Sequence, residues 1–132
     1  MTHQRNRLAR SFPSTPESVG DIRNAIAQLA HSGGFHEEKV EAIRLAVSEA
    51  ATNAVLHAYS DHSGTINVAA EIEAGGVLRV LIADEGRGML PHRESDGLGL
   101  GLPIITTMAD HVDITSPIGN RGTEVHMRFH PG

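Results

Sequence analysis

The sequence predicts an α+β fold, a two-layer α/β sandwich with helices on one face of a mixed, mostly antiparallel sheet. Two long segments repeat apolar residues at helical spacing, and several further segments read as strands. Their order along the chain is β-α-α-β-β-α-β-β, which suits helices that pack on hairpin-paired strands. A Rossmann fold needs regular βαβ alternation, so this order argues against it.

The first part of the chain is expected to hold one strand and two helices. Residues 6–12 read as a strand, in which Arg10 shares a face with apolar neighbours. Ser14-Thr15-Pro16-Glu17 is typical of a helix start, with a hydroxyl cap and a proline in the first turn, and Gly33-Gly34 ends that helix. The second helix is expected from about residue 36 to about residue 58. The apolar residues at helical spacing are Val19, Ile22, Ile26, Leu29, Ile43, Val47, Ala50 and Ala54.

The rest of the chain is expected to be rich in strands. Residues 65–73 alternate apolar with polar side chains, and an apolar run follows over residues 77–83. Because Gly75-Gly76 lies between the two runs, they read as a hairpin closed by a tight turn. The remaining expected elements are a third helix over residues 100–109 and strands over residues 111–116 and 123–129.

Length and composition indicate one domain, covering residues 1–132, and exclude several classes of protein. The net charge is -5, so a basic surface for nucleic acid is not expected. The chain has no cysteine, which excludes disulfides and thiol chemistry. No signal peptide is recognisable, and no segment approaches the ~18 apolar residues of a membrane helix. We therefore expect a cytoplasmic protein that contacts neither membrane nor nucleic acid.

Three polar residues on the second predicted helix form a candidate site. Glu49, Asn53 and His57 are spaced by four residues, so they line one side of the helix. That line borders the apolar stripe, where the small side chains of Ala46 and Ala50 leave room for a ligand. The alternative is an ordinary solvated helix flank.

A second candidate segment follows the apolar strand over residues 77–83. Asp84 stands at the end of that strand, with Gly86 and Gly88 just beyond it. A carboxylate there could accept a hydrogen bond from an exocyclic amine, and the glycines allow backbone and ligand to approach closely. An ordinary turn is the alternative interpretation.

A third candidate segment, Asp96-Gly97-Leu98-Gly99-Leu100-Gly101-Leu102-Pro103, leads into the third predicted helix. Free backbone N–H groups at a helix start are a natural phosphate site. The glycine spacing does not match a dinucleotide fingerprint, and a Gly-Lys-Ser/Thr phosphate loop is missing. Lys39 is the only lysine in the chain. Phosphate charge must therefore be met by Mg²⁺, backbone dipoles, arginine or histidine.

Taken together and in this order, these segments and the turn at residues 119–125 resemble the N, G1, G2 and G3 boxes of the GHKL (Bergerat-fold) ATPase and kinase family. The resemblance covers roughly residues 36–129. Within the family, the run Val47-Ser48-Glu49-Ala50-Ala51-Thr52-Asn53-Ala54 is similar to that of anti-sigma factor serine/threonine kinases of the RsbW/SpoIIAB type.

The resemblance implies a site for ATP and Mg²⁺. Asn53 would supply an oxygen ligand to Mg²⁺, which prefers such hard ligands. Asp84 would accept the adenine amino group, and the Thr123 hydroxyl would support the adenine side. The other implied ATP-binding residues are His57, Gly86, Gly88, Gly97, Gly99, Leu100 and Gly101.

The resemblance also implies an enzyme, a protein serine/threonine kinase with Glu49 as the catalytic base. Its expected partners are a STAS-type anti-sigma factor antagonist, which it would phosphorylate, and a sigma factor, which it would bind. A homodimer is also expected, through the edge of the N-terminal strand.

Only eight residues separate Gly88 from Gly97, so the expected ATP lid is short. This favours one alternative, a non-catalytic ATP-binding or partner-switching module. The catalytic half of a histidine kinase is a further alternative, against which the run around Glu49 and Asn53 argues.

Overall fold

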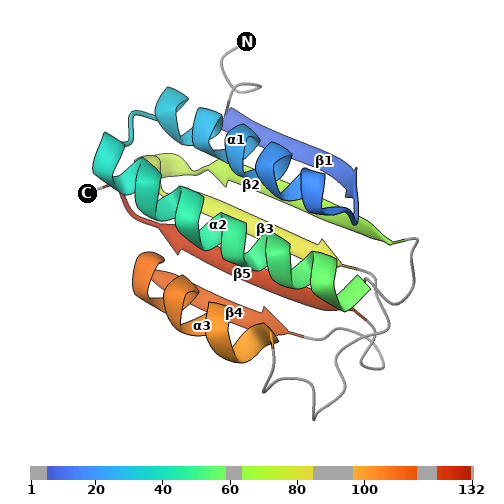
Figure 1. Ribbon diagram of the computed structural model, residues 1–132. Helices are drawn as coiled ribbons and strands as arrows, with labels where there is room; N and C mark the ends of the chain where they lie inside the picture. Colours follow the sequence, from blue (N-terminus) through green and yellow to red (C-terminus); the bar gives the residue numbers. More distant parts are fainter. Residues whose placement is uncertain (1–5, 59–63, 85–96, 116–121, 132) are drawn as a thin grey trace.

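The computed structural model describes residues 6–58, 64–84, 97–115 and 122–131 of the 132-residue chain. Its elements are, in chain order, β1 (Arg7–Pro13), α1 (Pro16–Ser32), α2 (Glu37–Ala58), β2 (Thr65–Ile72), the 3-10 turn η3 (Ala74–Gly76), β3 (Leu78–Asp84), α3 (Gly97–Met108), β4 (His111–Thr115) and β5 (Thr123–Phe129). Figure 1 shows the three α-helices side by side over one face of a single sheet. The predicted two-layer α+β sandwich is confirmed.

The sheet has five strands in the order β1-β2-β3-β5-β4. Every neighbouring pair of these strands is antiparallel, so the described part of the sheet contains no parallel pair. The mostly antiparallel character expected from the sequence is confirmed. Strand β5 lies between β3 and β4, so the last strand of the chain is interior, whereas β1 and β4 are the edges.

The core lies between the sheet and the helices. In β3, Leu78, Val80 and Ile82 are buried, while the residues between them are more exposed. The central helix, α2, contacts α1 on one side and α3 on the other, and it packs on β2, β3 and β5. The largest fully buried apolar side chains are Phe129, Ile22, Ile26, Ile43, Ile66, Leu78, Ile82, Ile105 and Met127.

Helix α1 begins and ends close to the predicted residues, but its start is not capped as expected. Pro16 occupies the first turn, and Thr15 is extended at the N-cap without a side-chain hydrogen bond to a backbone N–H of the helix. The Thr15 hydroxyl lies 3.3 Å from Ser18 Oγ instead. At the other end, Gly34 has a φ of 87°, a left-handed conformation that favours glycine. The Gly34 and Phe35 N–H groups donate to the carbonyls of His31 and Ala30, as in a Schellman motif.

Two other boundaries differ from the prediction. The β2–β3 connection is wider than a two-residue turn, because the Glu73 N–H donates to the Val77 carbonyl and η3 fills the loop. Helix α3 begins at Gly97, three residues before the expected Leu100. Glycine costs only about 1 kcal/mol per residue in a helix, which tertiary contacts can outweigh.

None of the helices in the described ranges is long and apolar enough to cross a membrane.

Candidate functional site

Two buried polar residues face each other across neighbouring strands. Asp84 is the last residue of β3 and Thr123 is the first residue of β5, and the two are directly paired in the antiparallel register. Both continue the inward-facing alternation of their strands, so their side chains lie on the helical side of the sheet. Asp84 is 6% exposed and Thr123 is 3% exposed. The strand pattern therefore places a carboxylate and a hydroxyl where apolar side chains would be usual.

A further buried polar residue, Asn53, lies on α2, which contacts both β3 and β5. Figure 1 shows that the C-terminal end of α2, the end of β3 and the start of β5 share one end of the molecule. Asn53, Asp84 and Thr123 are therefore brought to the same end of the helix–sheet layer.

Two of these residues carry polar atoms without a protein partner. Asn53 Nδ2 and Thr123 Oγ1 are buried, and neither has a hydrogen-bond partner among the described residues. An unsatisfied buried polar group costs about 1–3 kcal/mol. Native proteins usually satisfy such groups with a protein, water or ligand partner. A polar ligand at this end of the molecule would provide one.

For most of the remaining predicted site residues, the structure describes only the position of the backbone. Glu49 is half-buried and lies one helical turn before Asn53. His57 belongs to the last turn of α2. The glycine-rich segment with Gly97, Gly99, Leu100 and Gly101 forms the start of α3, where the first N–H groups of a helix have no intrahelical acceptor. Gly86 and Gly88 lie outside the described residues.

The only lysine of the chain is engaged far from this site. Lys39 Nζ lies 2.9 Å from Asp110 Oδ2, which also accepts a 2.8 Å hydrogen bond from the His130 N–H. That backbone hydrogen bond, followed by the one from Lys39, lowers the pKa of Asp110 below its usual value of 3.8. Since a helix rises about 1.5 Å per residue, Lys39 lies roughly 20 Å from Asn53 along α2. Lys39 is therefore not a phosphate ligand at the candidate site.

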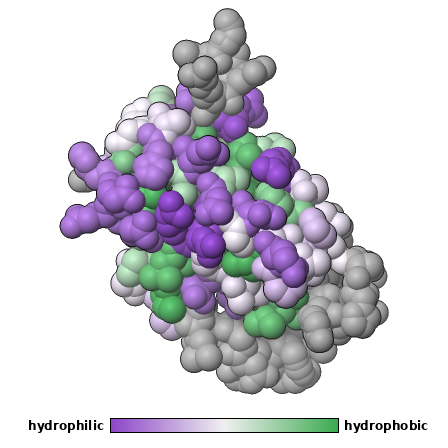
Figure 2. All heavy atoms as spheres, turned by 45° about the horizontal axis from the view of Figure 1, so that its top comes forward, coloured by the Kyte–Doolittle hydropathy of each residue, from purple (hydrophilic) through white to green (hydrophobic). Residues whose placement is uncertain are grey.

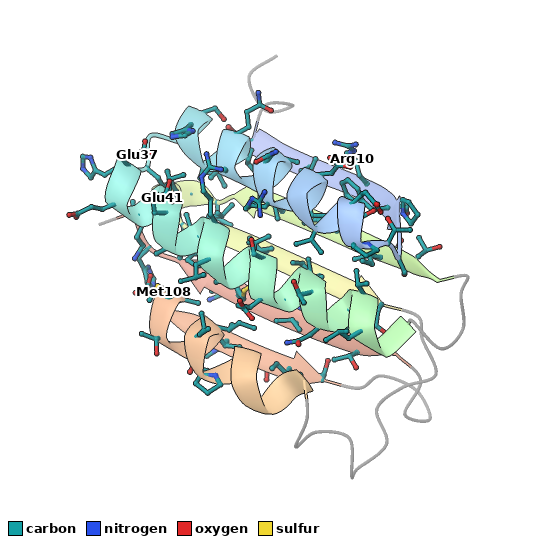
Figure 3. The ribbon with its side chains drawn as sticks, viewed as in Figure 1. Arg10, Glu37, Glu41 and Met108 are labelled. Atoms are coloured by element: carbon teal, nitrogen blue, oxygen red, sulfur yellow. The ribbon has the colours of Figure 1, made fainter. Side chains whose placement is uncertain are left out.

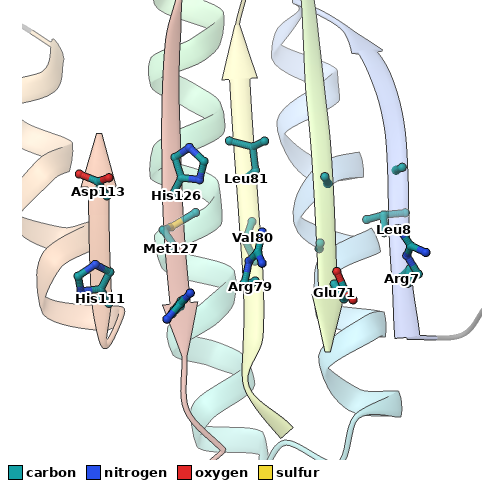
Figure 4. Close-up of a pocket in the computed structure, with 14 residues that line it drawn as sticks. Arg7, Leu8, Glu71, Arg79, Val80, Leu81, His111, Asp113, His126 and Met127 are labelled. Atoms are coloured by element: carbon teal, nitrogen blue, oxygen red, sulfur yellow. The ribbon is translucent and has the colours of Figure 1, made fainter. Parts of the chain in front are cut away.

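A shallow hollow of about 470 Å³ lies on the opposite face of the sheet. Figure 4 shows Arg79, Leu81 and His126 among the side chains that line it. Two side chains there have acidic neighbours, Arg79 with Glu73 at 3.0 Å and His126 with Glu124 at 3.2 Å. An antiparallel sheet often leaves one face to solvent in this way. The hollow contains none of the predicted site residues and does not compete with them as the candidate site.

The structure also reveals two residues that the motif analysis did not consider. Leu45 and Leu56, both on α2, are 41% and 54% exposed. They share a helical stripe with Glu49, because the steps from Leu45 through Glu49 and Thr52 to Leu56 are four, three and four residues. The spacing was visible in the sequence, but the exposure was not.

Comparison with known proteins assigns this arrangement to a family. The family described as "Histidine kinase-like ATPase domain" matches residues 12–129. The serine-protein kinase RsbW of Oceanobacillus iheyensis is 35% identical over 128 residues, which cover 85% of this chain and 80% of the relative. RsbW of Bacillus subtilis is 31% identical over 132 residues, covering 89% of this chain and 80% of that protein. An anti-sigma F factor of Thermoanaerobacter sp. is 29% identical, with 96% of this chain and 95% of that protein covered.

Solved structures agree with the sequence relatives. The RsbU and RsbW domains of Rv1364c from Mycobacterium tuberculosis superpose with a TM-score of 0.74 at 25% identity, covering 94% of this chain. The histidine kinase domain of a blue-light activated kinase from Erythrobacter litoralis EL346 gives a TM-score of 0.61 at 28% identity, covering 91% of this chain. This chain spans only 31% and 62% of those two solved chains. Since the family match extends over nearly all of the described fold, the chain belongs to the family of histidine kinase-like ATPase domains.

Proposed function

We propose that this chain is an ATP-binding serine/threonine protein kinase of the anti-sigma factor type. It would phosphorylate an anti-sigma factor antagonist and bind a sigma factor. The relatives named serine-protein kinase RsbW and anti-sigma F factor support this function. The structural observation that carries it is the buried Asn53 amide, which lies one turn after the half-buried Glu49 and whose Nδ2 has no hydrogen-bond partner among the described residues.

The buried polar residues fit the adenine and metal ends of a nucleotide. Asp84 would accept a hydrogen bond from the adenine amino group, and Thr123 Oγ1 would gain a partner on the same side of the base. Asn53 would hold Mg²⁺ through its amide oxygen, a hard ligand of the kind this ion prefers. Its Nδ2 donor would then be free to reach a phosphate oxygen. Bound Mg²⁺ would neutralise phosphate charge.

The backbone would provide most of the remaining contacts. At the start of α3, N–H groups without an intrahelical acceptor suit an anionic phosphate. The residues assigned there are Gly97, Gly99, Leu100 and Gly101. Gly86, Gly88 and His57 complete the proposed ATP-binding set.

Glu49 would act as the general base for the protein substrate. Transfer forms a bond between the serine Oγ and the γ-phosphorus, and it breaks the bond from that phosphorus to the oxygen that leaves with ADP. The Glu49 carboxylate would take the hydroxyl proton as the new bond forms. General-base catalysis of this kind is worth about 10²–10⁴-fold in rate.

Replacement of the proposed base tests the function. The protein, its Glu49→Gln variant and a matched Glu38→Gln control would each be incubated with γ-labelled ATP, Mg²⁺ and candidate antagonist proteins. Glu38 is on the same helix but exposed, so its variant should transfer phosphate like the unmodified protein. We expect Glu49→Gln to lose about 10²–10⁴-fold in transfer rate while ATP affinity is kept. Undiminished transfer by Glu49→Gln would refute the assigned role of Glu49.

A non-catalytic ATP-binding or partner-switching module is the second candidate function. The eight residues between Gly88 and Gly97 favour it, because a short lid leaves less chain to close over the phosphates. The same experiment separates the two functions. Intact ATP binding without transfer to any antagonist would support the module.

The proposed partners and location follow from the proposed function. The antagonist would be a STAS-type domain, and the complex with a sigma factor would form in the cytoplasm. A homodimer would form through β1, which pairs only with β2 among the described strands and so leaves one edge open.

A further inference from the structure

Helix α2 exposes two leucines on either side of Glu49. Leu45 and Leu56 are the exposed large hydrophobic residues of the described part of the chain, at 41% and 54%. With Glu49 and Thr52 they form one stripe, because residues three and four apart share a helix face. We call Leu45, Glu49, Thr52 and Leu56 the α2 stripe. Thr52 is exposed, and Glu49 is half-buried.

Charge is distributed unevenly along the helical layer. The first turns of α2 are rich in charge, and Figure 3 shows Glu37 and Glu41 there. From Leu45 to Ala58, Glu49 is the only acidic or basic residue when histidine is counted as neutral. The whole of α3 carries no acidic or basic residue. Over Leu45–Ala58 of α2 and the whole of α3, Glu49 is therefore the one acidic or basic residue, in a chain of which 20% is charged.

The neighbouring helix α3 also exposes uncharged side chains. Pro103, Thr106 and Thr107 are exposed on α3, which lies beside α2. Both threonine hydroxyls donate to the Pro103 carbonyl, so they are partly satisfied within the helix. Figure 2 shows hydrophilic side chains gathered over one part of the helical face, with hydrophobic residues exposed beside them.

We propose that the α2 stripe is the docking surface for the protein that carries the phosphoacceptor hydroxyl, and that this partner binds through an uncharged, partly apolar face. The proposal rests on the proposed kinase function, because it assigns the substrate of the same site. Two exposed leucines that bracket Glu49 would hold a partner on both sides of the base, so its hydroxyl meets the carboxylate between them.

The distribution of charge favours a protein partner with an uncharged binding face. The core of a protein–protein interface is depleted of charged residues, as this surface is. A strongly charged peptide would lose hydration here and find few opposite charges among the described residues. Glu41, one turn before Leu45, is paired with Arg44 at 3.3 Å, and Glu49 is needed for the proton. An uncharged protein face loses less on binding and buries the leucines.

Binding of an antagonist to matched leucine variants tests the proposal. The unmodified chain, Leu45→Ser and Leu56→Ser would each be titrated with a purified STAS-type antagonist in the presence of an ATP analogue. We expect each variant to weaken antagonist binding about tenfold, the loss typical of an interface contact worth about 1.4 kcal/mol. Affinity for the ATP analogue should stay unchanged, because neither leucine is assigned to the nucleotide. Thr52→Lys, which adds a charge between the leucines, should weaken antagonist binding similarly.

The matched control is Leu81→Ser, on the opposite face of the sheet, which should bind antagonist like the unmodified chain. Antagonist affinity should also change little between low and high salt, since screening acts on charged contacts. Thermal unfolding of each variant checks that it is folded.

The outcomes separate docking from catalysis. Weaker binding by the stripe variants supports the docking surface, even when no phosphate is transferred, in which case only the kinase function fails. Unchanged binding by Leu45→Ser and Leu56→Ser, or no binding of any antagonist by the unmodified chain, overturns the proposal. A stripe variant that alters only the sedimentation of the free protein also overturns it, because the leucines would then cover a second copy of this chain.

Discussion

At the residue scale, Asp84 and Thr123 occupy inward-facing strand positions that usually hold apolar side chains. Asn53 is likewise a polar residue at a buried position, on helix α2. Glu49, Asn53 and Asp84 were recognisable from the sequence, because helix spacing and a strand end place them. Thr123 was implied only by the family resemblance, since alone it is one residue of a turn. Its burial opposite Asp84 depends on strand pairing, which local periodicity does not report.

Substitution of Thr123 by valine should have opposite effects on the free protein and on nucleotide binding. Valine has nearly the same shape but no hydroxyl, so it removes a buried polar atom that lacks a partner among the described residues. We expect the free energy of unfolding without nucleotide to stay equal or rise by about 1 kcal/mol. Affinity for ATP should fall, as measured by calorimetry. A clear loss of stability in the free protein would show that the hydroxyl has a structural partner.

Asp84→Asn should weaken adenine binding by about 1–3 kcal/mol, because an amide presents a donor where the amino group needs an acceptor. Calorimetric titration with ATP measures the change, and Asp21→Asn, on the exposed side of α1, provides the control. Unchanged ATP affinity in Asp84→Asn would count against the whole adenine assignment.

At the scale of single elements, local sequence patterns predicted nearly every helix and strand. Some boundaries, such as the start of α3, differ from the prediction by a few residues. Strand β1 illustrates why an unfavourable pattern can still form a strand. Arg10 shares a face with Phe12, and its guanidinium lies over the Phe12 ring, 4.6 Å from the centroid. Because β1 is an edge strand, Arg10 stays exposed while Phe12 is buried.

The glycines of α1 and its end should respond to alanine in opposite directions. Gly34 has a φ of 87°, so Gly34→Ala should destabilise the fold by about 1 kcal/mol although the space around it is open. Gly20 lies inside α1, and an added Cβ would meet only the end of the Arg23 side chain at 3.3 Å. Gly20→Ala should therefore stabilise by about 0.5–1 kcal/mol. Chemical denaturation of both variants measures the difference, and equal effects would contradict the assigned helix end.

At the scale of the whole molecule, one carboxylate joins segments that are distant in sequence. Asp110, before β4, accepts hydrogen bonds from Lys39 on α2 and from the His130 N–H after β5. Asp110 also donates its own N–H to the Arg128 carbonyl. Hydrogen bonds thereby connect the first part of α2 and the residues that follow β5 to the same turn before β4.

This tie predicts a dependence of stability on pH. The pKa of Asp110 is lowered in the folded protein, first by the His130 N–H and then by Lys39. A lowered folded pKa contributes stability above the unfolded pKa and loses it as pH falls through the folded value. Asp110→Asn should therefore cost about 1 kcal/mol at neutral pH. The difference should begin to shrink near the unfolded pKa, at about pH 4, and vanish only below the lowered folded pKa. Urea unfolding across pH measures it, with Asp21→Asn as control. A constant difference down to acid pH would contradict this assignment.

The sequence by itself determined most helices and strands, the spacing of Glu49, Asn53 and His57 along one side of a helix, and the family. These features depend on spacing within short segments, where one residue constrains the next through the backbone. Only the tertiary structure decided the strand order, with β5 between β3 and β4. It also decided the pairing of Asp84 with Thr123, the burial of Asn53 and the exposure of Leu45 and Leu56. The physical reason is that burial and strand pairing depend on which distant segment packs against each face.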